Sequence, residues 1–180
     1  MNNTEPGSER AALVVLSTGE RVRDAKTWER KRRPEIVKLF EEHVFGRSPG
    51  KPEKLGFELK SIDKVALDGK AVRKEVTILF AGKADALKAD MLLYLPASAK
   101  GPVPVFLGLN FAGNHTVHAD PGISATKSWV RKEMPRGSDS ESWPIEKIIA
   151  RGYGVATIYY GDIDPDFDDG FANGVHAIYG

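Results

Sequence analysis

An apolar run that ends abruptly in a polar loop constrains the fold of this chain more than any other feature. Residues 103–109 read Val-Pro-Val-Phe-Leu-Gly-Leu, and residues 110–116 read Asn-Phe-Ala-Gly-Asn-His-Thr. Continuous apolar runs of this length are typical of strands buried on both faces of a parallel sheet. We therefore expect a buried strand whose carboxyl end carries the polar loop, which is where open α/β sheets bind their ligands.

A second apolar run repeats this plan further along the chain. Residues 153–160 are apolar and open into the polar residues 161–165. Between the two runs, residues 143–151 predict a short helix, with Pro144 in its first turn, an apolar side and Gly152 as its stop signal. We predict two buried parallel strands joined by one helical crossover.

The segment before residue 103 carries the signals of antiparallel strands. Residues 57–67 and 71–80 alternate in polarity and are joined by Asp68-Gly69-Lys70, which predicts a hairpin. Residues 89–95 supply a third strand, ended by Pro96. The fold class is thus α/β: a mixed sheet with antiparallel edge strands followed by parallel strands, and flanking helices.

The amino-terminal residues predict a tail and a helix. Residues 1–12 are expected to form a flexible tail, and residues 13–180 a single domain. Asp24 is placed to cap a helix that Pro34 either interrupts or restarts, and Gly46 is placed to end it.

Composition excludes several classes of partner and chemistry. The formal net charge is +1, so no strongly basic face for nucleic acid is expected. No apolar stretch approaches the roughly 20 residues of a membrane span, so no membrane partner is expected. Cysteine is absent, which excludes disulfides, thiolate metal sites and cysteine nucleophiles.

No serine of the chain has the context of a hydrolase nucleophile. Residues 46–50 match G-x-S-x-G, but they follow a predicted helix rather than a strand. Pro49, directly after Ser48, has no backbone N–H to donate to an oxyanion. Residues 122–126 come close to the motif, but no predicted strand leads into Ser124. We therefore assign no catalytic residue.

The loop after the first apolar run is the stronger site candidate. A loop in this place supplies an oxyanion donor in α/β-hydrolases. Gly113 would allow close backbone approach, and Asn114 would donate hydrogen bonds. In the alternative, Asn and His side chains hold their own backbone. His115 is a poor candidate for a catalytic base. The candidate substrate or oxyanion loop consists of Asn110, Phe111, Ala112, Gly113, Asn114 and His115.

Alternating aspartates after the second run suggest a calcium loop but fail its requirements. The four residues are Asp162, Asp164, Asp166 and Asp168. An EF-hand needs Gly at its sixth position and Glu at its twelfth, and neither register starting at Asp162 or Asp164 supplies them. We predict no metal and no cofactor, with a looser calcium site as the alternative to a structural turn.

Taken together, several stretches resemble the glucuronoyl esterases, α/β-hydrolases related to acetyl xylan esterases that act on plant cell-wall material. The stretches are residues 28–35, 39–46, 108–116, 151–157 and 160–166. In that family the catalytic serine lies in a G-x-S-R-x-G-K elbow after a further helix and strand, and the acidic residue and histidine come later. None of them has a counterpart here. The resemblance implies that residues 13–180 form the N-terminal part of an α/β-hydrolase domain, incomplete and inactive alone.

The resemblance also implies a function for the parent protein. It would be a serine esterase with a serine–histidine–acid triad, acting on a small-molecule or polysaccharide ester of glucuronic acid. The alternatives are an acetyl xylan esterase-like hydrolase, or a non-catalytic remnant that binds carbohydrate or a partner chain. The family is typically secreted or periplasmic, but no signal peptide is visible in residues 1–10, so the compartment stays open.

An incomplete sheet also predicts self-association. The strand at residues 153–160 is expected to be left with an exposed edge, and such edges pair with other chains.

Overall fold

The computed structural model describes residues 14–48, 50, 54–82 and 87–179. The chain divides into two compact units, Met1–Gly50 and Lys51–Gly180. The tail predicted at residues 1–12 lies outside the described residues.

The described part of the first unit contains a helix in three consecutive pieces, α2 (Ala25–Thr27), η1 (Trp28–Arg32) and α3 (Arg33–His43). As predicted, Asp24 caps its start, because the backbone N–H of Thr27 donates to Asp24 Oδ1 at 2.7 Å. In the π-helical piece η1, the N–H of Arg33 donates to the carbonyl of Trp28, five residues back. Pro34 lies in the first turn of α3, so the helix continues through the proline.

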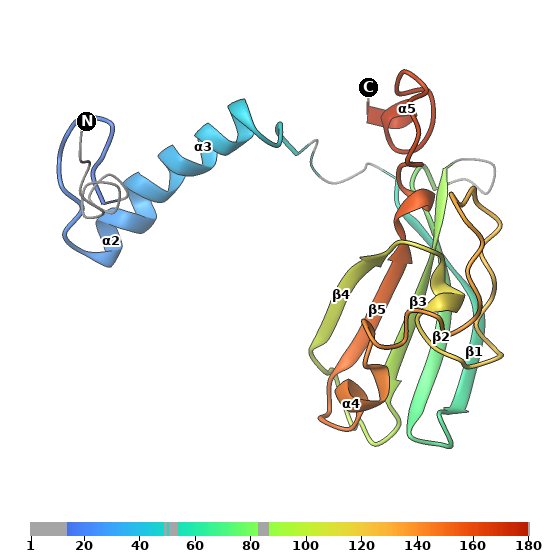
Figure 1. The fold of residues 1–180 in the computed structure, drawn as a ribbon. Coiled ribbons are helices and arrows are strands. Elements are labelled where there is room, and N and C mark those ends of the chain that lie inside the picture. The colour runs from blue at the N-terminus through green and yellow to red at the C-terminus, as the bar shows by residue number, and fades with distance from the viewer. Residues whose placement is uncertain (1–13, 49, 51–53, 83–86, 180) are drawn as a thin grey trace, which may run out of the picture. The chain divides into compact units, whose positions relative to one another are not determined.

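The second unit contains a mixed five-stranded sheet in its described part (Figure 1). Its strands are β1 (Gly56–Ala66), β2 (Ala71–Leu79), β3 (Lys88–Pro96), β4 (Val105–Asn110) and β5 (Gly154–Tyr159), in the order β1-β2-β3-β5-β4. The pairs β1–β2, β2–β3 and β3–β5 are antiparallel, and β4–β5 is parallel. The predicted mixed sheet is confirmed.

Local signals account for the connections between these strands. The β1–β2 turn holds Leu67, Asp68 and Gly69 at positive φ, a conformation that the Asp-Gly pair, unlike Leu67, adopts readily. The crossover from β4 to β5 contains the predicted helix, α4 (Ile145–Ile149), and Gly152 at φ +82° follows it. Three short helical segments complete the unit: η2 (Asn114–Thr116), η3 (Tyr160–Asp162) and α5 (His176–Tyr179).

The positions of the two parallel strands correct two expectations. All of β5 is buried between β3 and β4, so the exposed edge predicted at residues 153–160 is wrong. Of the two parallel strands, β4 is the one at an edge of the sheet. The prediction that this strand is buried on both faces is also wrong, because Val105, Leu107 and Leu109 are 43%, 68% and 48% exposed. The reason is that β5 inserts between β3 and β4, and no described segment covers these three side chains.

The core lies on one face of the sheet, under α4 and the long connection between β4 and β5 (Figure 1). Leu92 and Tyr94 of β3 and Val155 of β5 pack there against Ile145 and Ile149 of α4. On β2 the same face carries two charged residues in place of apolar ones. These are Arg73 and Glu75, and both are buried. The connection is therefore fastened to the sheet by charge as well as by apolar contact.

Candidate functional site

The predicted site loop begins where β4 ends, and Asn110 braces it from within. The Asn110 side chain is fully buried. Its Nδ2 donates to Asn114 Oδ1 at 2.7 Å and to Thr157 Oγ1 at 3.0 Å, and its Oδ1 accepts the backbone N–H of Gly113 at 2.9 Å. A buried amide that uses both ends in this way fixes the loop conformation.

The other polar members of the loop also face inward. Asn114 Nδ2 donates to the carbonyl of Asp90 at 2.7 Å, and His115 Nε2 lies 3.1 Å from the carbonyl oxygen of Met134. Gly113 has φ +99°, and a Cβ there would lie 2.9 Å from Thr126 Cγ2. Only glycine fits this backbone without strain. Together with Asn110, these three residues hold the loop in place through inward contacts.

Phe111 and Ala112 are the members of the loop that the structure leaves outward. Phe111 is 77% exposed, and its ring packs against Tyr160 at a centroid distance of 5.4 Å. Ala112 is half-buried. The six predicted residues thus separate into an internal frame and an outward pair.

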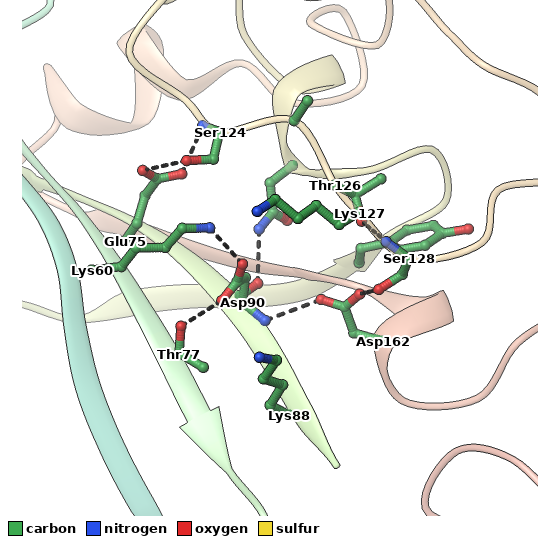
Figure 2. A pocket seen from close by; sticks show the side chains of 13 residues that line it. Lys60, Glu75, Thr77, Lys88, Asp90, Ser124, Thr126, Lys127, Ser128 and Asp162 are labelled. Carbon is green, nitrogen blue, oxygen red and sulfur yellow. Dashed lines mark hydrogen bonds and ion pairs between the residues drawn. The ribbon is translucent and has the colours of Figure 1, made fainter. Parts of the chain in front are cut away.

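Asn114 also lines a polar cavity of about 310 Å³ between β1–β3 and residues 124–128 of the connection (Figure 2). Six charged side chains line it, three ammonium groups and three carboxylates: Lys60, Lys88, Lys127, Glu75, Asp90 and Asp162. Asp90 accepts Lys60 Nζ at 2.7 Å and Thr77 Oγ1 at 2.6 Å. Burial works to raise the pKa of Asp90, but these two donors outweigh it and lower the pKa.

Asp162 is the buried carboxyl of this cavity, at the carboxyl end of β5. Its Oδ1 accepts Ser128 Oγ at 2.5 Å, and its Oδ2 accepts the backbone N–H of Asp90 at 3.0 Å. Burial raises the pKa of Asp162, and the two hydrogen bonds offset only part of that rise. The sequence drew attention to Asp162 only as part of a calcium pattern, although its place directly after a buried strand was a usable signal.

Glu75 fastens the connection to β2 on the other side of the cavity. Its carboxylate accepts the backbone N–H of Ser124 at 2.7 Å, Ser124 Oγ at 3.0 Å and Ser61 Oγ at 2.7 Å. Ser124 lies in an irregular segment with no strand leading into it. Its hydroxyl therefore serves as an anchor of the connection.

A second buried anchor lies beside the first. Arg73 Nη1 and Tyr94 Oη both donate to Asp120 Oδ2, at 2.5 and 2.6 Å. Burial opposes ionisation of Asp120, yet the bonds from Tyr94 and Arg73 lower its pKa. A Cβ at Gly122 would overlap the Arg73 guanidinium, so a larger residue there would push this group from its place beside Asp120.

The aspartates of the calcium pattern have partners within the protein. Within the described ranges, no three His, Cys, Asp or Glu side chains are grouped to hold a metal ion. Asp166 pairs with Arg131 at 2.6 Å, and Asp164 lies 3.4 Å from His176 Nε2. Asp168 and Asp169 accept backbone N–H groups of the following turn. In the same ranges, no helix has the length and apolarity to cross a membrane.

The sheet order, with a loop and a buried carboxyl at the carboxyl ends of β4 and β5, defines a partial α/β-hydrolase fold. No family model matches the sequence. A glucuronoyl esterase from Solibacter usitatus has a similar structure, with TM-score 0.86 and 48% identity over 94% of this chain and 45% of that one. A promiscuous CE15 esterase from a marine bacterial metagenome gives TM-score 0.77 and 48% identity, over 92% and 44% of the two chains.

Sequence comparison agrees with the structural comparison. Carbohydrate esterase MZ0003, from an unidentified prokaryote, is 49% identical over an alignment of 179 residues, and the match covers 92% of this chain and 41% of the relative. The chain thus spans less than half the length of the relatives it matches. Its homologues are glucuronoyl esterases of family CE15, and it corresponds to an N-terminal portion of them. The resemblance seen in the sequence is confirmed.

Proposed function

We propose that this chain is the N-terminal portion of a carboxylic ester hydrolase that acts on glucuronate esters of plant cell-wall polysaccharide. The observation that carries the proposal is the similarity to a glucuronoyl esterase, at 48% identity and TM-score 0.86 over 94% of the chain. The whole protein would transfer the acyl group to a serine and then to water. Residues 13–180 would form one incomplete domain of that enzyme.

In this proposal the chain supplies the floor and one wall of the ester site. The frame of Asn110, Gly113 and Asn114 holds the loop in one conformation. The backbone of Phe111 and Ala112 is then positioned in advance, as an oxyanion donor must be. The nucleophile would come from the family's G-x-S-R-x-G-K elbow, which has no counterpart among these 180 residues.

A second candidate, hydrolysis of acetyl esters, has one specific observation in its favour. A relative with 48% identity is described as a promiscuous CE15 esterase. A pocket of broad specificity would accept both acyl groups, so the experiment must compare them directly.

Labelling with a serine-directed fluorophosphonate tests the proposal. The 180-residue chain should stay unlabelled, and a longer version that includes a G-x-S-R-x-G-K elbow should label. The longer version should hydrolyse benzyl glucuronate more efficiently, in kcat/KM, than p-nitrophenyl acetate. Its elbow Ser→Ala variant is the control and should lose both activities. Labelling of the short chain would contradict the assignment of the nucleophile, and a preference for acetate would favour the second candidate.

We also propose that the isolated chain self-associates through β4. The two edge strands differ sharply in protection against pairing. β1 carries charged residues along its length and two register irregularities against β2. β4 carries no charge and pairs with β5 in unbroken register. Charges and bulges protect an edge from pairing with other chains, so β4 is the exposed site.

A further inference from the structure

The segment between η3 and α5 contains an asparagine followed directly by a glycine. This dipeptide occurs once in the sequence, at Asn173-Gly174. It lies in irregular chain, and Asn173 is exposed to solvent. Glycine has no side chain to shield its backbone nitrogen, so the carboxamide of a preceding asparagine can approach that nitrogen closely. The pair therefore permits a reaction between the side chain of Asn173 and the backbone.

The backbone nitrogen of Gly174 differs from those of the glycines in the two Asp-Gly pairs of the chain. The N–H of Gly69 donates to the carbonyl of Val65 at 2.9 Å. The N–H of Gly170 donates to Asp168 Oδ1 at 3.1 Å. Among the described residues, the N–H of Gly174 has no acceptor. A nitrogen that attacks a neighbouring carbonyl carbon must first lose its proton, and at Gly174 no hydrogen bond has to break for this.

The hydrogen bonds of the preceding turn stop one residue short of Gly174. The Asp169 carboxylate accepts the N–H groups of Ala172 at 3.2 Å and of Asn173 at 3.0 Å. The carboxamide of Asn173 has no hydrogen-bond partner in the described part of the chain. Gly174 has φ +66°, and a Cβ there would overlap the carbonyl oxygen of Ile163. The fold thus requires glycine at this position and leaves the asparagine before it unrestrained.

The two asparagines of the site loop have the opposite environment. Asn110 and Asn114 are buried, and their carboxamides are hydrogen-bonded. The residues that follow them are Phe111 and His115, whose side chains crowd the backbone nitrogen. Burial, hydrogen bonding and a bulky successor all oppose the reaction that Asn173 permits.

We propose that Asn173 deamidates spontaneously in the folded protein and becomes aspartate and isoaspartate. Hydroxide removes the proton from the Gly174 nitrogen, which then bonds to Asn173 Cγ. The Cγ–Nδ2 bond breaks, and the nitrogen leaves as ammonia with the proton returned. Water opens the resulting succinimide at one of its two carbonyl groups. One water is consumed and one ammonia released, without an oxidant, reductant or cofactor, and the inference does not depend on the proposed function.

The modification changes the charge and the length of the backbone in this segment. A carboxylate at position 173 would lie near the carboxylate of Asp169, which binds the same turn, and near Asp164, which lies against Gly174. Isoaspartate also inserts a methylene group into the backbone directly before Gly174. The N–H of Val175 donates to the carbonyl of Ile163 at 2.8 Å. Repulsion and the longer backbone should weaken this bond, which ties the segment to the end of η3.

Incubation of the 180-residue chain at neutral and at mildly alkaline pH, followed by digestion and peptide mass spectrometry, tests the assignment. The peptide with Asn173 should gain about 1 Da, at a rate that rises with hydroxide concentration. Enzymatic methylation of isoaspartyl carboxylates should label the same peptide. The peptides with Asn110 and Asn114 should change at least about tenfold more slowly, because their carboxamides are buried and bonded. In urea all three asparagines are exposed, and the ratio of the rates should shrink.

Asn173→Gln is the matched control, because it keeps the carboxamide but would have to close a larger and slower-forming ring. It should neither gain mass nor take the label. After incubation, the amide of Val175 should exchange its hydrogen faster in the unaltered chain than in this variant.

Three results would overturn the inference. An unmodified Asn173 peptide, or equal rates at the three asparagines of the folded chain, would refute the assignment of the site. A ratio of rates that urea leaves unchanged would show that the dipeptide alone, and not the folded structure, sets the selectivity. Equal exchange at Val175 in the two proteins would refute the structural consequence.

Discussion

Replacing Asp120 with Ala removes the shared acceptor of the buried Arg73–Asp120–Tyr94 anchor. The side chains of Asp120 and Arg73 are 11% and 9% exposed, so solvent screens their interaction little. After the change, Arg73 keeps one carboxylate neighbour within 4 Å among the described residues, Asp63 at 3.9 Å. The guanidinium would then be buried without a close counter-ion, and the Tyr94 hydroxyl would lose its acceptor.

The expected cost follows from this loss. Removing one partner of a buried ion pair costs about 3–5 kcal/mol of folding free energy. We take about 3 kcal/mol for Asp120→Ala, because Asp63 compensates part of the charge. For a chain of this size each kcal/mol lowers the Tm by roughly 2–4 °C. The expected fall in Tm is therefore about 6–12 °C.

Urea unfolding followed by circular dichroism measures this change, and two variants calibrate it. Asp63→Ala removes a half-exposed carboxylate at 3.9 Å and should cost less than about 1 kcal/mol. Tyr94→Phe removes one hydrogen bond and should cost about 1–1.5 kcal/mol. If Asp120→Ala costs no more than Asp63→Ala, the connection is not held by this anchor and the reasoning is refuted.

Three further predictions concern the loop, the cavity and the edge. Gly113→Ala should cost about 1–3 kcal/mol in urea unfolding, because of its positive φ and the contact with Thr126, whereas Gly101→Ala, in open space, should be neutral. Burial raises the pKa of Asp162, so between pH 3.8 and the pKa of the folded state the native protein binds more protons than the unfolded chain. The free energy of unfolding therefore falls as pH rises through this window. Asp162→Asn should remove this fall, and an unchanged pH profile of stability would contradict the prediction. Leu107→Lys on β4 should shift the chain toward monomer in sedimentation, and Val65→Lys on β1 should not; equal behaviour would contradict pairing through β4.

Much of the fold could be predicted because its signals are local. The Asp68-Gly69 turn, Pro96 at the end of the third strand, and Gly152 after α4 each act on neighbouring residues. The order of β4 and β5 could not be predicted in this way. Both strands are apolar runs of the same kind, and which one lies at the edge depends on the path of the crossover between them.

The candidate site was predictable in position but not in the roles of its residues. The end of the apolar run placed a loop at residues 110–115, but it could not show that the Asn110 and Asn114 amides bond to each other. The burial of Arg73 and Glu75 was missed, since charged residues on a strand usually indicate a solvent face. Their partners Asp120 and Ser124 are more than 40 positions away in the chain, and no local pattern links them.

The buried charges on β2 have a consequence for the motions of the connection between β4 and β5. Long irregular segments ordinarily open on their own and exchange their amide hydrogens well before the rest of a domain. Here any opening would break the Arg73–Asp120 ion pair and the Glu75–Ser124 hydrogen bonds, and would expose the apolar core residues that the connection covers. Residues 118–124 should therefore exchange their amide hydrogens more slowly than an irregular segment without such anchors, at a rate closer to that of the sheet.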